Sequence, residues 1–160
     1  MRGRFLFLPL ILAWALVAPA AASGAIPAAK NLQSAAEQAA RAGQVVLVVF
    51  TVYDCPYCEI AMNDYLIPMA KDPAYRAKVR ILEVKMDQQT PLTDFAGRRS
   101  THENFAFAQK VRVAPTVKLY LPSGESAAEP IVGLTLEDFY GAYVNRAIED
   151  ALARSRAARR

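Results

Sequence analysis

Residues 45–59 have the sequence VVLVVFTVYDCPYCE, and the rest of the chain is interpreted outward from them. The first seven residues are mostly β-branched and do not alternate between apolar and polar, which predicts a strand buried on both faces. The only two cysteines of the chain, Cys55 and Cys58, follow with C-x-x-C spacing. Pro56 between them suits the first position of a helix. The stretch therefore predicts a buried strand that leads through a short loop to a helix beginning at the cysteine pair.

The cysteine pair could serve as a redox couple, as half of a metal site or as a structural crosslink. A structural zinc site needs about four ligands, and the chain adds only one histidine, His102, to the two cysteines. No metal site and no cofactor are therefore predicted. A crosslink across so short a loop restricts the unfolded chain little, because this benefit grows with loop length. The redox couple is favoured.

The start of a helix is a favourable place for a thiolate. Free backbone N–H groups and the positive end of the helix dipole stabilise an anion there, so the pKa of the Cys55 thiol is expected to fall and its nucleophilicity to rise. The neighbouring carboxylate of Asp54 opposes part of this effect. Cys58, one turn later, is expected to resolve the mixed disulfide that Cys55 forms with a partner.

The pattern along the rest of the chain predicts an α/β fold in which short helices connect buried strands of a mixed sheet. A polar, turn-rich connection is expected over residues 88–101. Thr135 followed by Asp138 resembles the cap of the last predicted helix. The predicted helices are residues 28–42, 56–67, a short one from 73, 103–110 and 136–153, and the further strands are 79–86, 116–121 and 131–134. The last helix carries one apolar stripe, made of Leu136, Phe139, Tyr140, Tyr143, Val144, Ala147 and Ile148.

The first 22 residues have the layout of a signal peptide: a basic head, an apolar stretch over 5–17 and small residues over 18–22. A retained membrane anchor is the alternative. The apolar core is shorter than the roughly 20 residues that a bilayer span needs, so cleavage and export to the periplasm are favoured. The remaining chain then consists of one domain, residues 23–153, and a basic tail, 154–160. Because the formal net charge of +4 arises at the two ends, it does not indicate a nucleic-acid partner.

Two landmarks together resemble the thioredoxin superfamily: the strand, C-P-Y-C and helix, and the segment Val-Ala-Pro-Thr at 113–116 before a later strand. The resemblance implies a thioredoxin fold with a mixed central sheet and helices on both faces. It also implies that Pro115 is a cis-proline beside the cysteines and that Ala114 pairs with the substrate backbone. A longer connection that contains residues 94–97, and Asp54 in place of a tryptophan, are similar to exported thioredoxin-like proteins of the SoxW type.

The sequence departs from that family at two positions that face each other in the resemblance. Val49 stands where a buried aspartate is usual, and Glu83 stands where the neighbouring strand usually has lysine. We therefore hypothesise that Glu83 is a half-buried carboxylate that helps to remove the proton from Cys58. The alternative is that Glu83 points to solvent on an alternating strand. Pro56 and Tyr57, within C-P-Y-C, are expected to tune the site, with Tyr57 exposed.

The remaining candidate residues have simpler interpretations. His102 precedes a helix in a polar connection, which predicts a surface or capping role. Three methionines could suggest copper binding, but their apolar surroundings are typical of a core; they are Met62, Met69 and Met86.

These patterns favour an exported thiol–disulfide oxidoreductase that reduces disulfides in exported partner proteins and is itself kept reduced by a membrane electron donor. A non-catalytic binding module on a thioredoxin-like scaffold is one alternative. A glutathione-dependent, glutaredoxin-like enzyme is another, because C-P-Y-C also occurs in glutaredoxins.

Overall fold

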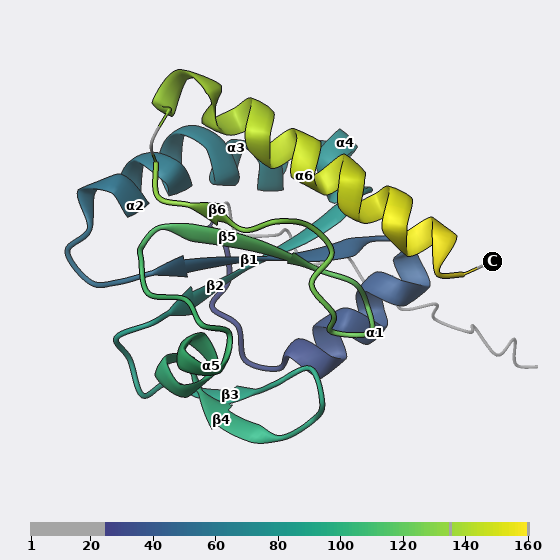
Figure 1. Cartoon of the computed structure of the whole chain (residues 1–160), viewed down its shortest axis with the longest axis horizontal. Helices are drawn as coiled ribbons and strands as arrows, with labels where there is room; N and C mark the ends of the chain where they lie inside the picture. Colours follow the sequence, from purple (N-terminus) through teal and green to yellow (C-terminus); the bar gives the residue numbers. More distant parts are fainter. Residues whose placement is uncertain (1–24, 135, 160) are drawn as a thin grey trace, which may run out of the picture.

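The computed structural model describes residues 25–134 and 136–159 of the chain. The predicted signal peptide and the proposed cap residue Thr135 lie outside the described residues. Figure 1 shows a central sheet with helices packed on both of its faces. The strands are β1 (Val45–Thr51), β2 (Val79–Lys85), β3 (Pro91–Thr93), β4 (Arg99–Thr101), β5 (Thr116–Tyr120) and β6 (Ile131–Val132). The helices are α1 (Leu32–Ala42), α2 (Pro56–Ile60), the π-helix η1 (Ala61–Leu66), α3 (Ile67–Lys71), α4 (Pro73–Arg76), α5 (His102–Ala108) and α6 (Glu137–Ala157).

The main sheet is built around β1. Its strand order is β2-β1-β5-β6, with β1 parallel to β2 and antiparallel to β5. All seven residues of β1 are buried, as its uninterrupted apolar run predicts. Alternate residues face opposite layers: Leu47 and Val49 pack in one core with α6, while Val48 and Phe50 pack in the other with α1 and α5. The predicted mixed sheet with helices on both faces is thereby confirmed.

The helix that begins at Pro56 was predicted to end before Pro68, and that prediction is wrong. The chain continues without a break through α2, η1 and α3 to Lys71. Proline lacks an N–H and its ring conflicts with the carbonyl four residues earlier in a regular α-helix. In η1 the N–H of Ile67 instead donates to the carbonyl of Met62, five residues earlier. This wider turn brings the helix to Pro68 in a changed hydrogen-bond register.

The connection over residues 88–101 contains a short antiparallel hairpin, β3–β4, that the sequence did not predict. Asp94 organises its turn: its carboxylate accepts hydrogen bonds from the backbone N–H groups of Ala96 and Arg98, and from the Arg98 side chain at 2.8 Å. Burial raises the pKa of Asp94. The hydrogen bonds from Arg98 and Ala96 lower it by more than burial raises it, so the net pKa lies below the usual value. The hairpin also forms a bridge from Thr93 to Asn31, just before α1.

His102 is fully buried, so the predicted surface or capping role is wrong. Its Nδ1 accepts a hydrogen bond from the backbone N–H of Lys85 at 2.9 Å, and its Nε2 lies 2.7 Å from the carbonyl oxygen of Ala29. Because a backbone N–H can only donate and a carbonyl can only accept, the ring is neutral with its proton on Nε2. His102 therefore joins α5 to β2 and to the N-terminal segment.

The last helix, α6, is longer than predicted and buries less of its predicted stripe. It ends at Ala157, so it includes the first arginines of the expected basic tail; Arg154 donates to the carbonyl of Ala127, and Ser155 is buried. Tyr140, Val144, Ala147 and Ile148 are buried as predicted, whereas Leu136, Phe139 and Tyr143 are exposed. Among the described residues, no helix is both long and apolar enough to span a membrane.

Candidate active site

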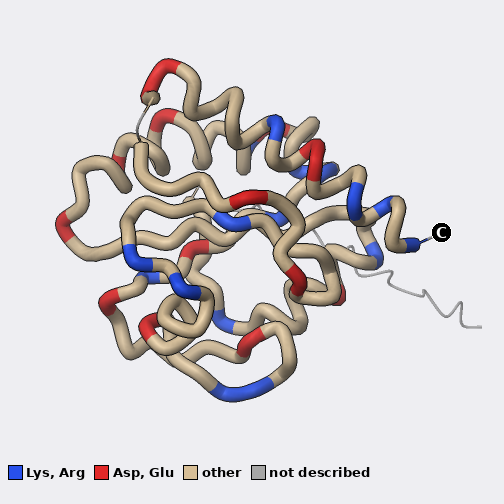
Figure 2. The backbone as a smooth tube through the Cα atoms, in the orientation of Figure 1, with Lys and Arg blue, Asp and Glu red and all other residues tan. Residues whose placement is uncertain are grey.

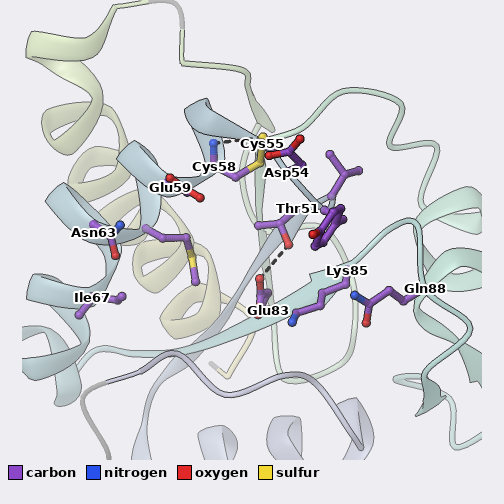
Figure 3. A pocket seen from close by; sticks show the side chains of 13 residues that line it. Thr51, Asp54, Cys55, Cys58, Glu59, Asn63, Ile67, Glu83, Lys85 and Gln88 are labelled. Carbon is purple, nitrogen blue, oxygen red and sulfur yellow. Dashed lines mark hydrogen bonds between the residues drawn. A yellow bond between two sulfur atoms is a disulfide. The ribbon is translucent and has the colours of Figure 1, made fainter.

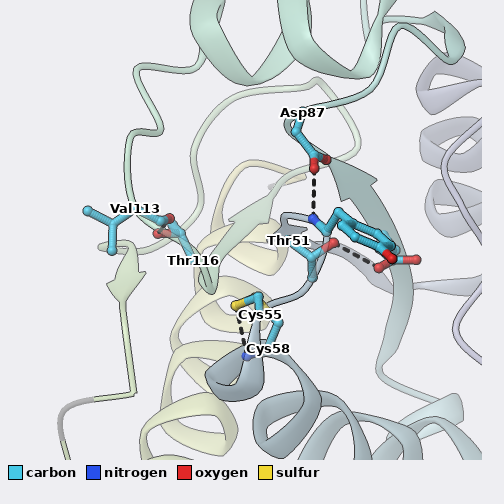
Figure 4. Close-up of a disulfide and its surroundings, with 8 residues drawn as sticks. Thr51, Cys55, Cys58, Asp87, Val113 and Thr116 are labelled. Carbon is cyan, nitrogen blue, oxygen red and sulfur yellow. Dashed lines mark hydrogen bonds between the residues drawn. A yellow bond between two sulfur atoms is a disulfide. The ribbon is translucent and has the colours of Figure 1, made fainter.

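Cys55 and Cys58 form a disulfide at the start of α2, at the end of the loop that follows β1 (Figure 4). Cys55 is the N-cap of the helix, and its sulfur accepts a hydrogen bond from the Cys58 N–H at 3.1 Å. Cys55 is half-buried, while Cys58 is buried with 5% of its surface exposed. An incoming sulfur can therefore reach Cys55 more readily than Cys58, which is the asymmetry that an attacking and a resolving cysteine require.

The loop between β1 and α2 is held by a carboxylate from the turn that follows β2. Asp87, just after β2, accepts a hydrogen bond from the Tyr53 N–H at 2.7 Å, and the N–H of Met86 donates to the carbonyl of Thr51 at 2.8 Å. Asp54 then adopts a left-handed conformation with φ 52°, which aspartate tolerates better than most residues. These contacts fix the turn that presents Cys55 as a helix cap.

The segment 113–116 lies beside the disulfide, as Figure 4 shows for Val113 and Thr116. The peptide bond between Ala114 and Pro115 is cis. The Thr116 hydroxyl donates to the Val113 carbonyl at 2.7 Å and so closes the turn before β5. Pro115 is buried and Ala114 is half-buried, while Val113 is exposed.

A pocket of about 420 Å³ opens next to the cysteines, and Glu83 lines it (Figure 3). Glu83 lies on β2 directly opposite Val49 of β1, and its carboxylate is half-buried. The Thr51 hydroxyl donates to Glu83 Oε1 at 2.8 Å. The lining residues are Thr51, Val52, Tyr53, Asp54, Cys55, Cys58, Glu59, Met62, Asn63, Ile67, Glu83, Lys85 and Gln88. A carboxylate and the buried cysteine thus share one small cavity.

Two tyrosines close to the cysteine pair in sequence are exposed. Tyr57, inside C-P-Y-C, is 62% exposed, as expected, and Tyr53 is 83% exposed. Neither ring is packed into the core, so both are available to contact another molecule. Exposed aromatic rings are enriched where proteins meet partners.

Sequence reasoning missed Thr51, Lys85 and Asp87, although all three surround the site. Thr51 is the only hydrogen-bonding side chain in β1, and Asp87 lies two residues after the end of β2. Those positions were visible in the sequence, but the contact of Thr51 with Glu83 depends on the register between β1 and β2. Within residues 25–134 and 136–159, no three His, Cys, Asp or Glu side chains are grouped as metal ligands would be.

Comparison with known proteins agrees with this geometry. Residues 32–147 match a family model described as a thioredoxin-like domain. No curated protein matches the sequence significantly.

Three solved structures illustrate the likeness of the fold. Mitochondrial thioredoxin 3 from Saccharomyces cerevisiae is 18% identical, with a TM-score of 0.53 over 78% of this chain and 94% of that one. Thioredoxin O2 from Arabidopsis thaliana is 16% identical, with a TM-score of 0.51 over 76% and 94%. The thioredoxin pre-protein from Schistosoma mansoni is 20% identical, with a TM-score of 0.51 over 78% and 96%. At these identities the comparison shows the fold alone.

Proposed function

We propose that this chain, which belongs to the thioredoxin-like domain family, is an exported thiol–disulfide oxidoreductase that reduces disulfides in partner proteins. The observation that carries the proposal is the unequal exposure of the bonded pair: half-buried Cys55 caps α2, and buried Cys58 lies behind it. A purely structural disulfide would gain little from this short loop.

The proposed reaction transfers two electrons from the reduced pair to a partner disulfide. The Cys55 thiolate attacks one partner sulfur, a mixed disulfide forms, and the other partner sulfur leaves as a thiolate. The Cys58 thiol then loses its proton and attacks the Cys55 sulfur. This step forms the Cys55–Cys58 disulfide and releases the second partner thiolate. The N–H groups at the start of α2 favour the thiolate form of Cys55 that begins the first step.

Glu83 is the proposed acceptor of the Cys58 proton, since both side chains line the same pocket. The hydrogen bond from Thr51 to Oε1 holds the carboxylate in one orientation and leaves its other oxygen available. We expect Glu83→Gln to flatten the pH dependence of mixed-disulfide resolution while Cys55 still attacks at a similar rate. The exposed change Glu59→Gln on the same pocket is the matched control. Unchanged pH profiles in Glu83→Gln would end the proton-acceptor role.

The partner is proposed to dock as an extended segment beside Ala114 and Pro115, with Tyr57 contacting it from the other side. The support is geometric: Val113 and Thr116, which flank these two residues, lie in the surroundings of the disulfide (Figure 4), and Tyr57 is exposed. Such docking would add a strand-like backbone contact. Pro56 would tune the site by fixing the first turn of α2.

The finer parts of the proposal are the direction of electron transfer, the location of the protein and the donor that keeps it reduced. The signal-peptide layout of residues 1–22 supports export to the periplasm, and the likeness to the SoxW type supports a membrane electron donor and a reducing role. The reduction potential decides the direction. A value between about −270 and −180 mV fits a reductase, whereas one near about −120 mV indicates an oxidant. The N-terminal residue of the protein recovered from the periplasm tests processing, because an intact residue 1 would contradict cleavage.

Reduction of insulin by dithiothreitol tests the function itself. We expect the unmodified protein to accelerate precipitation of the insulin B chain, and both Cys55→Ser and Cys58→Ser to lose this acceleration. Equal rates in all three would indicate the alternative, a binding module without redox use. Activity confined to small glutathione mixed disulfides, retained in Cys58→Ser, would instead indicate a glutaredoxin-like enzyme.

A further inference from the structure

A second groove, of about 840 Å³, lies along the first half of β2, at the end of the sheet away from the cysteines. Its walls come from the N-terminal segment, from α3 and α4, and from residues 79–82 of β2. The active-site pocket takes Glu83 and Lys85 from the last half of the same strand. The two cavities are therefore separate sites on one strand.

Three cations line this groove: Lys71, Arg76 and Arg80. In the described part of the chain none of them forms an ion pair with a carboxylate, and no Asp or Glu lines the groove. The nearest carboxylate in sequence, that of Asp72, caps α4 by accepting from the Ala74 N–H. Uncompensated positive charge in a cavity attracts an acidic ligand.

Two polar groups on the walls are also left without partners. The Nε of Arg80 and the Oε1 of Gln44 are buried and make no hydrogen bond to the described residues. Gln44 is held in place by its other side-chain atom, which donates to the carbonyl of Arg76 at 2.6 Å. The Arg80 guanidinium is thus not used within the fold. Buried polar atoms of this kind mark places where a partner is missing.

The groove also contains an open backbone edge. The Glu83 N–H donates to the Pro27 carbonyl, and the Glu83 carbonyl accepts from the Ala29 N–H, so both groups point away from β1. Backbone groups two residues apart in a strand point the same way, so the N–H and carbonyl of Ile81 also point away from β1, toward the side where Ala25 and Pro27 line the groove. Neither has a partner among the described residues on that side.

We propose that this groove binds an extended, acidic peptide segment of a partner protein. The peptide backbone pairs with Ile81 on the edge of β2, its acidic side chains meet Lys71, Arg76 and Arg80, and its alternate side chains rest on exposed apolar residues, Pro73 and Ala77. A small anion would satisfy the cations but leave the strand edge and the apolar wall uncovered. Figure 2 shows that lysines and arginines also gather where α6 ends. Cys55 follows the last residue of β1, Thr51, and so lies toward the opposite end of the sheet from this groove. The site does not depend on the redox function.

Fluorescence anisotropy with a labelled eight-residue peptide of alternating Glu and Val tests the proposal on the full chain. We expect binding that weakens as salt is added, and no binding of the matching Lys–Val peptide. Lys71→Gln/Arg76→Gln should weaken binding about fivefold or more; both residues are exposed, so the fold is retained. The matched control Lys30→Gln/Arg99→Gln removes two exposed charges elsewhere and should change binding less than about twofold.

Hydrogen exchange at the Ile81 amide separates backbone pairing from simple charge attraction. The amide should exchange more slowly when the Glu–Val peptide is bound, and the same peptide N-methylated at alternate residues should bind poorly. Three results would each overturn the proposal. The control variant could weaken peptide binding as much as Lys71→Gln/Arg76→Gln does, or the hydrogen exchange of the Ile81 amide could stay the same when the peptide binds. The third result is displacement of the peptide by inorganic phosphate at low millimolar concentration. Failure of the peptide to bind at all would overturn it too, because it would show that the groove is closed in the full chain.

Discussion

Tyr140 of α6 is buried against Tyr65, with ring centroids 5.2 Å apart, yet its hydroxyl has no hydrogen-bond partner among the described residues. A buried, unsatisfied hydroxyl costs about 1–3 kcal/mol relative to its hydrated state. We predict that Tyr140→Phe stabilises the protein by about 1 kcal/mol, since the ring stays and the unpaired oxygen is lost. Urea unfolding at pH 7 measures the change. A loss of more than about 1 kcal/mol would mean that the hydroxyl does have a partner.

The same residue predicts how stability changes in alkali. Burial raises the pKa of Tyr140 to about 12, whereas the pKa of an unfolded tyrosine is about 10. The folded state therefore holds this proton more tightly, and the associated stability is complete below pH 10 and falls as the pH rises toward 12. Burial also raises the pKa of Tyr120.

Unfolding free energies at pH 8 and pH 11 check this expectation. Tyr140→Phe should lose less stability than the unmodified protein between the two pH values, because one of the groups with a raised pKa is removed. Equal losses in both proteins would exclude Tyr140 as a source of alkaline sensitivity.

Among the elements, α5 depends on a contact that its own sequence does not reveal. His102 satisfies the Lys85 N–H and the Ala29 carbonyl, which belong to β2 and to the N-terminal segment. We predict that His102→Phe destabilises the protein by about 3 kcal/mol, because two buried backbone groups lose their partners. The exposed neighbour Asn104→Ala should change stability by less than about 0.5 kcal/mol. If both variants unfold at the same urea concentration, the bridge contributes nothing measurable.

The elements that the sequence predicted well are those whose pattern reflects burial alone. β1 occupies the seven predicted residues because every one is buried, and α4 begins at Pro73, where the short helix was predicted. The continuation of the helix through Pro68 could not be predicted, because it depends on a change to π-helical bonding in η1. The hairpin β3–β4 was also missed, since its three-residue strands carry no alternation long enough to detect.

The same distinction applies to the candidate site. Cys55 and Cys58 were evident from spacing and from the strand before them, and segment 113–116 was evident from its resemblance. The bonds from Thr51 to Glu83 and from Tyr53 to Asp87 join residues more than 30 positions apart. Such contacts depend on the register of β1 and β2, which side-chain type alone does not specify.

At the scale of the whole molecule, the sheet separates two kinds of surface. One end of β1 leads to the disulfide and its acidic pocket, and the first half of β2 borders the basic groove. Both faces of β1, which joins these two regions, are covered by apolar layers.

The central claim is that Cys55 attacks and Cys58 resolves, and trapping of the mixed disulfide tests it most directly. Reduced Cys58→Ser and Cys55→Ser variants are each mixed with an oxidised model protein disulfide at pH 7, quenched with acid and analysed by mass spectrometry. The account predicts that Cys58→Ser accumulates a stable covalent adduct on Cys55 within minutes, while Cys55→Ser forms almost none. Adducts that form equally on both variants, or only through Cys58, would contradict it.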